Sequence, residues 1–576
     1  MLSPSTMLRP AITWLLGSLL ATAAPAVYAQ ARGLVPRANA IHQQRTGAEA
    51  TLDSTIRAGK LEELQWPDFS GLRNDVASMY RQSDHALVWL RDGHPTPQAL
   101  QLIAILQDAD SEGLLPEDYD ASRWPARLNR LQSQHSAYEE IRFDVALTVC
   151  AMRYSSDLKI GRTNPQEFNF ALNEGPKEDD NLPSFVMQRL ANGSDPHTEL
   201  AALEPPWPGY RELKEALQTY EQLAQEDDGE KLPSADAPGY PGPPYPGFER
   251  LCRFLRLLGD LPESYSIEAG SKAILDPVLQ QAVQSFQERH GLPTTGYLDK
   301  KTLEELNVPL SSRAEQIRLA MERYRWVRNY QPEGSVLLNI PSFQLYAFDD
   351  QGKRALSMRI HVGEDFDDTR TPVLDSTIEY LVFRPYWEVP FDIQRNEVLP
   401  KITDSLDLSQ FDYEALSKSG KVIASGRVSS ALLQEIRSGR VHIRQRPGPD
   451  NPMGLLKFAF PNRYSVYLHD TPFRDLEFRS WENVTSHGCI HLEKPAELAA
   501  WMLRDQAQWD LSKVQQAMLN GPDNVRVNLS KPVPVRIFYT TATALQHGHL
   551  HFYRDIYGYD AELRDALSKA YLRRNR

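Results

Sequence analysis

The sequence predicts an α+β protein built from several domains, helical in its first half and mainly β in its second. The chain has 576 residues, enough for three or four domains of about 150 residues each. Val145, Val149 and Met152 stand at i, i+4 and i+7, which is the spacing of one helix face. Further along the chain the period falls to two, as in Val336 and Leu338, which is typical of strands.

The first 29 residues match a secretory signal peptide. The cation Arg9 precedes the apolar run Ala11–Leu20, and Val27-Tyr28-Ala29 forms a small-residue exit, so cleavage after Ala29 is expected. A retained membrane anchor is the alternative, but the run is shorter than the ~20 residues that a span requires. The mature chain is therefore expected to work outside the cytoplasm, without a stable membrane span.

Helices and connectors are expected to fill the chain up to residue 247. Residues 30–55 are polar and unpatterned and are interpreted as a linker, and residues 56–230 as a helical scaffold domain. The predicted apolar faces contain Leu72, Val76, Met79, Tyr80, Leu100, Ile103 and Leu106. Residues 231–247 contain six prolines, which exclude a helix or a central strand and predict an extended connector.

Residues 248–310 carry the pattern of a small module of three helices. Asp276-Pro277 is an N-cap followed by proline at the first helical position, and Gly291 is placed to end the same helix. The run Ala282–Leu292, with Thr295-Gly296 and Thr302-Leu303 after it, resembles the peptidoglycan-binding-domain-1 family. A module that only packs on its neighbours is the alternative, because fold alone does not fix function. Residues 311–332 are predicted as a connecting helix.

Residues 333–510 are predicted to form a mainly β domain. The segment Asp349-Asp350-Gln351-Gly352 lies between two alternating runs and is a hairpin signal. The predicted strands are 336–340, 343–348, 355–362, 377–383 and 464–468, with 525–529 and 535–539 further on. An insertion at about 396–440 is mixed helical and polar, and such a length is typical of a lid over a site. Residues 511–576 are expected to add C-terminal strands and a tail that packs on the β and scaffold domains.

Charge and motifs exclude several classes of protein. The net charge of −13, from 63 basic and 76 acidic residues, repels a phosphate backbone, so no nucleic-acid partner is expected. His-Glu-x-x-His, paired Cys-x-x-Cys and phosphate-loop patterns do not occur, so a metallopeptidase or a nucleotide enzyme is not predicted. His547, His549 and His551 alternate and would share one face of a strand, where an edge strand is favoured over a metal site. We predict no metal and no cofactor.

The cysteine count leaves at least one thiol unpaired. The chain has three cysteines, Cys150, Cys252 and Cys489, and three in a secreted chain are not a disulfide framework. Cys150 and Cys252 lie beside apolar residues of predicted helices, so both are expected to be buried. A disulfide bond between Cys150 and Cys252 is an alternative that the sequence leaves undecided, because only coordinates can test its geometry.

Cys489 ends a Ser-His-Gly-Cys turn whose surroundings fit a nucleophile. An adjacent imidazole makes a thiol nucleophilic, and the predicted strand 464–468 delivers His469. Gly488 permits a tight turn, in which consecutive N–H groups are placed to form an oxyanion hole. A helix predicted at 495–503 follows. The pattern favours cysteine acyl transfer, with a buried structural cysteine as the alternative.

A wider pattern resembles one catalytic family. His469, sixteen intervening residues and then Ser486-His487-Gly488-Cys489 are similar to the signature of the L,D-transpeptidase (YkuD-type) catalytic domain. The flanking motifs that resemble its large Gram-negative branch are Val362-Gly363, Thr371-Pro372, 385–390, 457–462 and 467–472. The resemblance implies a helical scaffold, a peptidoglycan-binding module and a mainly β catalytic domain with a cap at about 396–440, acting in the periplasm without a cofactor.

The resemblance also implies a role for each residue of the motif. Cys489 is the expected nucleophile, and His469 is the expected general base that later protonates the leaving amine. The backbone N–H groups of Gly488 and Cys489 are the expected oxyanion donors. Ser486 and His487 are expected to shape the turn, with His487 lining the pocket.

Three further residues are expected to bind the substrate. Tyr467 and Trp387 resemble positions on the substrate wall, with a place in the core as the alternative. His491 stands where the family usually has arginine. Because arginine is a fixed cation whereas histidine is mostly neutral at pH 7, this departure puts recognition of a substrate carboxylate, or the packing of the turn, in question.

The implied function is peptidoglycan L,D-transpeptidation. In that family the cysteine attacks the carbonyl at the L-centre of a donor tetrapeptide and releases D-alanine, and an amine of a second stem then forms a 3→3 cross-link. One alternative is a hydrolase with the same cysteine, namely an L,D-carboxypeptidase, an endopeptidase or a lipoprotein-detaching enzyme. The other alternative is a non-catalytic wall-binding scaffold. Stem peptides are the expected partners, other cell-wall enzymes are further candidates, and carbapenems are expected to acylate Cys489.

Overall fold

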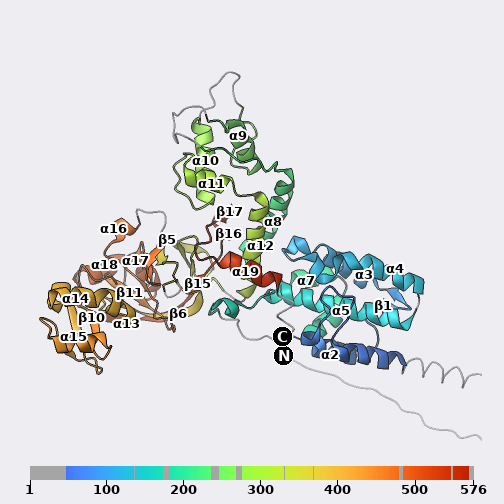
Figure 1. Ribbon diagram of the computed structural model, residues 1–576, viewed down its shortest axis with the longest axis horizontal. Coiled ribbons are helices and arrows are strands. Elements are labelled where there is room, and N and C mark those ends of the chain that lie inside the picture. Colours follow the sequence, from blue (N-terminus) through green and yellow to red (C-terminus); the bar gives the residue numbers. More distant parts are fainter. Residues whose placement is uncertain are drawn as a thin grey trace, which may run out of the picture.

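Helices of the first half and strands of the second half form separate units, as the change of period in the sequence predicts (Figure 1). The computed structural model describes residues 47–134, 136–172, 181–234, 245–266, 275–327, 329, 331–366, 369–478, 484–546 and 549–569. The predicted signal peptide and residues 235–244 of the proline-rich connector lie outside these ranges. Within them, no helix combines the length and the apolar character needed to cross a bilayer.

Helix α5 (Ala137–Ile160) is the centre of the N-terminal unit. Its residues from Val145 to Met152 are all buried, so neighbouring helices cover it on every side. The surrounding helices are 47–58, α2 (Arg73–Gln82), α3 (Pro97–Gln107), α4 (Trp124–Gln134), α6 (Leu182–Ser184) and α7 (Pro196–Ala201). Cys150 belongs to this core, whereas Cys252 belongs to another one, and both are free thiols.

Two expectations for this unit are corrected. The predicted linker does not extend to residue 55, because residues 47–58 are helical and bury Leu52 and Ile56, one turn apart, in the scaffold core. Leu100 does not face the core, since it is 48% exposed. The buried stripe of α3 contains Ala99, Leu102, Ile103 and Leu106 instead.

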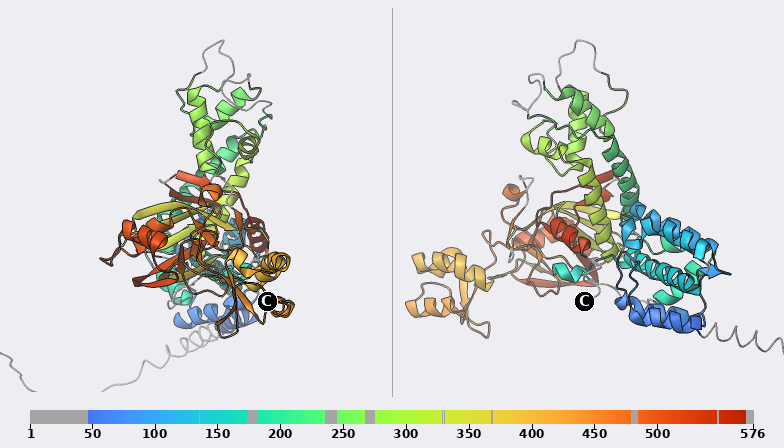
Figure 2. Two further views of the ribbon diagram at one scale, coloured as in Figure 1. Left: turned by 90° about the vertical axis from the view of Figure 1, so that its left-hand side faces the viewer. Right: turned by 45° about the vertical axis from the view of Figure 1, so that its right-hand side comes forward.

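Two long helices, α8 (Pro208–Glu226) and α12 (Leu310–Trp326), lie side by side and lead to the three-helix module (Figures 1 and 2). The module contains α9 (Phe248–Leu257), α10 (Pro277–Arg289) and α11 (Lys300–Leu306). The predicted cap is confirmed, because the Asp276 carboxylate accepts the Leu279 N–H at 2.8 Å. Gly291 follows α10 with a left-handed φ of 61°, as predicted for a residue that ends the helix.

The strands of the β unit close into a ring, because β5 pairs with both β4 and β14. Around the ring the order is β5 (Arg354–Gly363), β14 (Ile490–Leu492), β12 (Leu468–His469), β11 (Leu456–Ala459), β6 (Leu374–Phe383), β15 (Val525–Phe538), β3 (Val336–Asn339) and β4 (Gln344–Phe348). β13 (Val484–Ser486) pairs with β5 beside the ring. Closure leaves the eight strands of the ring without a free edge along their paired segments, which fixes their register.

Two strand predictions in this unit are corrected. The strand predicted at 464–468 begins only at Leu468, because the Asn462 side chain holds a turn by accepting the N–H groups of Tyr464 and Val466. The strands predicted at 525–529 and 535–539 are one strand, β15, whose pairing with β6 shifts between Asn528 and Val533. The shift spans Pro532, which has no N–H to donate.

The predicted domain boundary at residue 510 is also too early. Helix α17 (Pro495–Met502) occurs as predicted, and α18 (Leu511–Asn520) packs after it. β15 then pairs with β6 on one side and β3 on the other, so it is one of the strands that form the ring. The β unit therefore cannot close without residues beyond 510.

The insertion predicted at about 396–440 lies within a small folded unit, which we call the cap, at the left edge of Figure 1. Its sheet has the order β7 (Trp387–Glu388), β10 (His442–Gln445), β8 (Tyr413–Leu416) and β9 (Val422–Ala424). Helices α13 (Phe391–Ile393), α14 (Leu399–Ser405) and α15 (Ser430–Arg437) complete it. Its separate apolar core extends from Val389 to Ile443, slightly beyond the predicted bounds.

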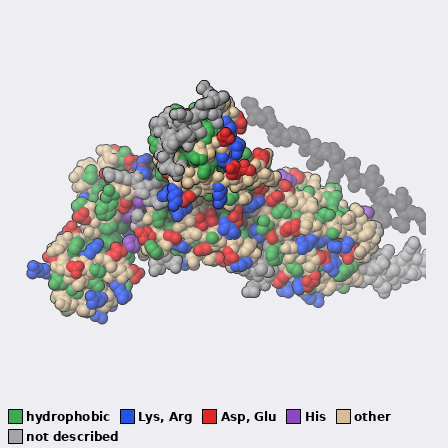
Figure 3. Space-filling view, turned by 45° about the horizontal axis from the view of Figure 1, so that its top comes forward, with side chains coloured by type: hydrophobic (Ala, Val, Ile, Leu, Met, Phe, Trp, Pro, Cys, Tyr) green, Lys and Arg blue, Asp and Glu red, His purple; other side chains and the backbone are tan. Residues whose placement is uncertain are grey.

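The C-terminal segment, defined as residues 539–569, contacts the ring, the module and α12. It contains β16 (Ala542–Gln546), β17 (His549–Phe552) and α19 (Tyr559–Ser568). Phe552 stacks on His290 of the module, with 5.5 Å between ring centroids. Asp560 forms a buried ion pair with Arg323 of α12. Acidic and basic side chains are interspersed over the face of the molecule shown in Figure 3, so the net charge is not gathered there.

Of the three alternating histidines near β17, the structure describes the side chain of His551. His551 is buried and its ring stacks on Tyr553 at 6.2 Å, while His547 lies outside the described residues. Among the residues with described positions, no group of three His, Cys, Asp or Glu side chains is arranged to hold a metal ion.

The ion pair between Arg323 and Asp560 should be a large contributor to stability. Asp560→Asn leaves the Arg323 guanidinium, whose side chain is 1% exposed, without its carboxylate. We expect the free energy of unfolding to fall by about 3–5 kcal/mol, the cost of breaking a buried pair. Lys569→Ala, which removes an exposed pair at the end of the same helix, should cost less than about 1 kcal/mol. Equal urea midpoints for the two variants would contradict this expectation.

Candidate active site

The parallel pairing of β12 with β14 brings the candidate nucleophile and base together. Leu468 pairs with Ile490 and His469 with His491, and the Ile490 N–H donates to the Tyr467 carbonyl at 2.9 Å. Because side chains alternate along a strand, His469 and His491 share a face with Cys489, which directly precedes β14. The structure thus brings two segments, separated by about twenty residues in sequence, onto neighbouring strands.

His469 is held as a neutral base. It is buried, and its Nδ1 lies 2.6 Å from the Asp470 carbonyl oxygen. Since a carbonyl only accepts, Nδ1 carries the proton and Nε2 keeps the lone pair. Burial lowers the pKa of His469 well below its ordinary value of about 6.5, and the neighbouring His491 and Lys457 lower it further. His469 can therefore accept a proton at neutral pH.

Cys489 is held as a thiol. It is half-buried, and desolvation raises the pKa of its thiol, while a hydrogen bond from the Tyr467 backbone and the charge of Lys457 act in the opposite direction. The resting pair at neutral pH is therefore a neutral thiol beside a neutral imidazole. Attack by sulfur then requires transfer of the thiol proton to His469 in the same step.

The turn before Cys489 is closed by Ser486. Its hydroxyl donates to the Cys489 carbonyl at 2.5 Å and accepts the Gly488 N–H at 3.2 Å. Gly488 has a φ of 100°, a left-handed conformation that favours glycine. One of the two predicted oxyanion donors, the Gly488 N–H, is thus already engaged. The Cys489 N–H has no acceptor among the described residues.

The other predicted site residues divide between the ring and the cap. His487 is 52% exposed, and its Nε2 lies 2.7 Å from a carboxylate oxygen of Glu397 in the cap. Tyr467 lies in the site, with the Lys457 ammonium 3.4 Å from its ring centroid. Trp387 belongs to β7 and packs on the core of the cap, and no described contact joins it to Cys489. A role for Tyr467 or Trp387 in substrate binding stays a prediction.

Sequence reasoning missed a row of basic residues across the sheet. Lys457 pairs with His469, His469 with His491, and His491 with His361, on four neighbouring strands. The registers of four strands cannot be read from one sequence, although Lys457 and His361 lie within or beside the motifs that the sequence singled out.

His491, in the position where the L,D-transpeptidase family usually has arginine, forms a hydrogen bond with a carboxylate. Its Nδ1 lies 2.9 Å from a side-chain oxygen of Glu477 in α16 (Arg474–Glu477), and the Glu477 carbonyl accepts His361 Nε2–H at 2.8 Å. His491 lowers the pKa of Glu477 against the effect of its burial. The His491 side chain therefore packs α16 against the sheet, and sequence reasoning had not identified its partner.

The comparisons with known proteins agree with the predicted domains. Residues 333–533 match the family model of the L,D-transpeptidase catalytic domain, residues 253–306 that of the "Putative peptidoglycan binding domain", and residues 74–217 that of a scaffold domain. The chain therefore contains an L,D-transpeptidase catalytic domain, a peptidoglycan-binding module and a scaffold domain.

A relative from Haemophilus influenzae, named "Putative L,D-transpeptidase", is 28% identical over 322 residues. This match covers 54% of the chain and 62% of the relative's own length, so the chain spans less than two thirds of that protein.

The protonation state of Cys489 can be tested by alkylation. Because the thiol has a raised pKa, its reaction with iodoacetamide should rise about tenfold per pH unit between about pH 6 and 8, as the thiolate fraction grows. Rates are read from the intact mass of the full chain, with Cys489→Ala as the control for the two other cysteines. A rate that is flat over this range would indicate a preformed thiolate–imidazolium pair and contradict the assignment.

Proposed function

We propose that the chain is a periplasmic peptidoglycan L,D-transpeptidase that forms 3→3 cross-links between stem peptides. The proposal is supported above all by the parallel pairing of β12, which contains His469, with β14, which directly follows Cys489, in an L,D-transpeptidase catalytic domain. The peptidoglycan-binding module supports a polymeric cell-wall substrate. Removal of the signal peptide predicted at residues 1–29 would release the mature enzyme into the periplasm.

Acylation begins with the donor tetrapeptide. As Cys489 Sγ bonds to the carbonyl carbon next to the terminal D-alanine, the thiol proton moves to His469 Nε2. The negative charge forms on the carbonyl oxygen, which would accept a hydrogen bond from the Cys489 N–H, a group with no acceptor among the described residues. The C–N bond then breaks, Nε2 returns the proton to the amine of D-alanine, and a thioester remains on Cys489.

Deacylation uses the same base. The side-chain amine of a second stem attacks the thioester carbonyl and gives one proton to His469 Nε2. The C–S bond breaks, the proton passes to the sulfur, and the new amide is the cross-link. Water in place of the amine would give a tripeptide, which is the reaction of the alternative hydrolase.

The cap supports transfer over hydrolysis. It is a folded unit of its own, and the contact between His487 and Glu397 joins it to the turn that carries Cys489. A cap over the thioester would limit access of water, while a wall-binding module holds the large acceptor nearby.

Products from a defined substrate test the proposal. The full chain, incubated with disaccharide-tetrapeptide, should release D-alanine and form cross-linked dimers that mass spectrometry detects, whereas Cys489→Ala should form none. Formation of tripeptide without dimers would indicate that the enzyme hydrolyses its substrate instead of transferring it. If the wild-type chain leaves the substrate unchanged, the remaining hypothesis is the non-catalytic wall-binding scaffold.

A second prediction concerns the base. His469→Ala should slow acylation of Cys489 by a carbapenem about 10²- to 10⁴-fold, the usual contribution of a general base. The adduct is followed by intact mass, with His442→Ala in the cap as a control that removes an exposed imidazole. Equal acylation rates for wild type and His469→Ala would reject His469 as the base.

A further inference from the structure

The hydroxyl of Thr371 contacts the peptide that precedes the sulfur. Thr371 is fully buried, and its Oγ1 donates to the Gly488 carbonyl at 3.0 Å while accepting the Gly363 N–H at 2.8 Å. Gly363 lies very close to this turn, because a Cβ placed there would come within 2.9 Å of the Gly488 backbone. The motifs Val362-Gly363 and Thr371-Pro372 thus meet at the catalytic turn.

The bond to the Gly488 carbonyl sets the direction of the Cys489 N–H. In a trans peptide the C=O and the following N–H point in opposite directions. A hydroxyl that holds the Gly488 carbonyl on one side therefore turns the Cys489 N–H to the other side. Among the described residues, no group accepts a hydrogen bond from the Cys489 N–H, whereas the Gly488 N–H donates to the Ser486 hydroxyl.

Tyr557 holds Thr371 and Gly363 together from the C-terminal segment. Its hydroxyl donates to the Gly363 carbonyl at 2.7 Å and accepts the Thr371 N–H at 3.2 Å. Burial raises the pKa of Tyr557 to about 12, so the phenol keeps the proton that it donates. Tyr557 lies beyond residue 533, where the match to the catalytic family model ends.

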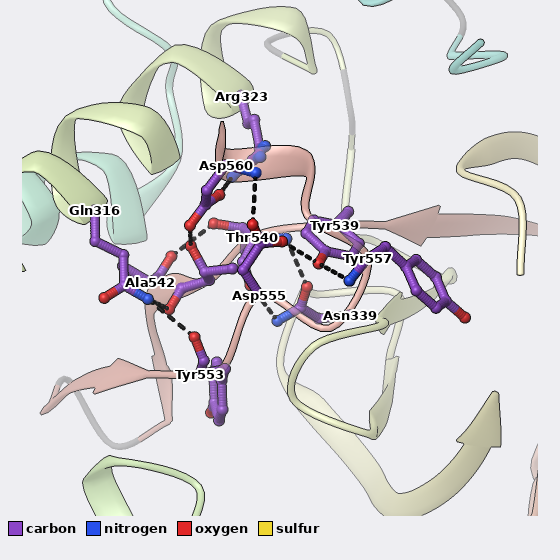
Figure 4. A network of polar contacts seen from close by, with 11 residues as sticks. Gln316, Arg323, Asn339, Tyr539, Thr540, Ala542, Tyr553, Asp555, Tyr557 and Asp560 are labelled. Atoms are coloured by element: carbon purple, nitrogen blue, oxygen red, sulfur yellow. Dashed lines mark hydrogen bonds and ion pairs between the residues drawn. The ribbon is translucent and has the colours of Figure 1, made fainter. Parts of the chain in front are cut away.

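Polar contacts anchor Tyr557 itself (Figure 4). Its N–H donates to the Tyr539 hydroxyl at 3.0 Å, and that hydroxyl donates to Asp555 at 2.5 Å. Asp555 accepts the Asp560 N–H at 2.9 Å, and Asp560 pairs with Arg323 of α12. A continuous series of hydrogen bonds and one ion pair therefore connects α12 to the peptide at Gly488.

We propose that Thr371 and Tyr557 are positioning residues, which orient the Gly488–Cys489 peptide so that the Cys489 N–H binds the oxyanion. The proposal rests on the acyl-transfer chemistry proposed above and assigns part of its machinery to the C-terminal segment. Neither side chain touches the reacting atoms: Thr371 acts through the Gly488 carbonyl, and Tyr557 acts through Thr371 and Gly363.

Two reagents separate a loss of orientation from a loss of structure. A carbapenem acylates the thiol through a tetrahedral oxyanion, whereas iodoacetamide alkylates it by displacement without forming one. Thr371→Val keeps the shape of the side chain but removes its hydroxyl, and Thr371→Ser keeps the hydroxyl. All variants are made in the full chain, and both reactions are followed at Cys489 by intact mass.

Thr371→Val should lower the rate of acylation about 10- to 100-fold, somewhat less than the 10²–10³ typical of removing an oxyanion donor. Its rate of alkylation should stay within about twofold of wild type, and Thr371→Ser should restore most of the acylation rate. Tyr557→Phe should show a smaller loss in acylation alone, whereas Tyr297→Phe, an exposed tyrosine of the module, should change neither rate.

Each outcome bears on a different claim. If the wild type is acylated and Thr371→Val is acylated at the same rate, the positioning role is overturned and the proposed function stays intact. Parallel losses of acylation and alkylation would also overturn it, because they indicate general damage to the site. A wild-type chain that reacts with iodoacetamide but neither with a carbapenem nor with disaccharide-tetrapeptide would reject the proposed function itself.

Discussion

The parallel pairing of β12 with β14 is the constraint on which the site depends. A parallel pair cannot be joined by a tight turn, so the chain must cross over between His469 and Cys489. That crossover contains α16, and it brings Glu477 against His491 and His361. A slip of one residue would turn every side chain of a strand to the opposite face. Closure of the ring opposes such a slip, because each of its strands is paired on both sides.

Burial and positive charge together decide the protonation of the site. A protonated His469 would be desolvated beside Lys457 and His491, so burial and these neighbours all lower the pKa of His469. The carboxylate of Glu477 in α16, beside this row, pairs with His491 rather than with His469. Among the described residues the hydrogen-bond partner of the His469 ring is the Asp470 carbonyl, which orients the imidazole without charging it. A neutral base suits a thiol that gives up its proton during attack.

The C-terminal segment joins the separate units, because it contacts the ring, the module and α12. Phe552 stacks on His290 of the peptidoglycan-binding module, and Asp560 pairs with Arg323 of α12. The same segment reaches the catalytic turn through Tyr557. Contacts of this kind fix the position of the module relative to the catalytic domain. The segment thus connects the placement of the domains with the geometry of the site.

The sequence alone determined the elements and the chemistry of the nucleophile. Periodicity located α5, α10 and most strands, the N-cap at Asp276 was read from its neighbours, and Cys489 with His469 came from one local motif. The predicted helices, strands and cap agree with the structure because period and capping are local properties of the chain, whereas the roles of Cys489 and His469 stay a prediction from the motif. Expectations failed where distant contacts decide the outcome, as in the turn held by Asn462 and in β15, which closes the ring beyond residue 510.

Only the tertiary structure decided which side chains contact the catalytic turn and the two histidines beside it. Lys457, Glu477, Thr371 and Tyr557 come from four separate segments, and the register of the ring and the docking of the C-terminal segment bring them there. It also decided that His491 pairs with Glu477 and that the Cys489 N–H has no acceptor within the described parts of the chain. A sequence specifies such contacts through the packing of the whole chain, so no short window of residues contains them.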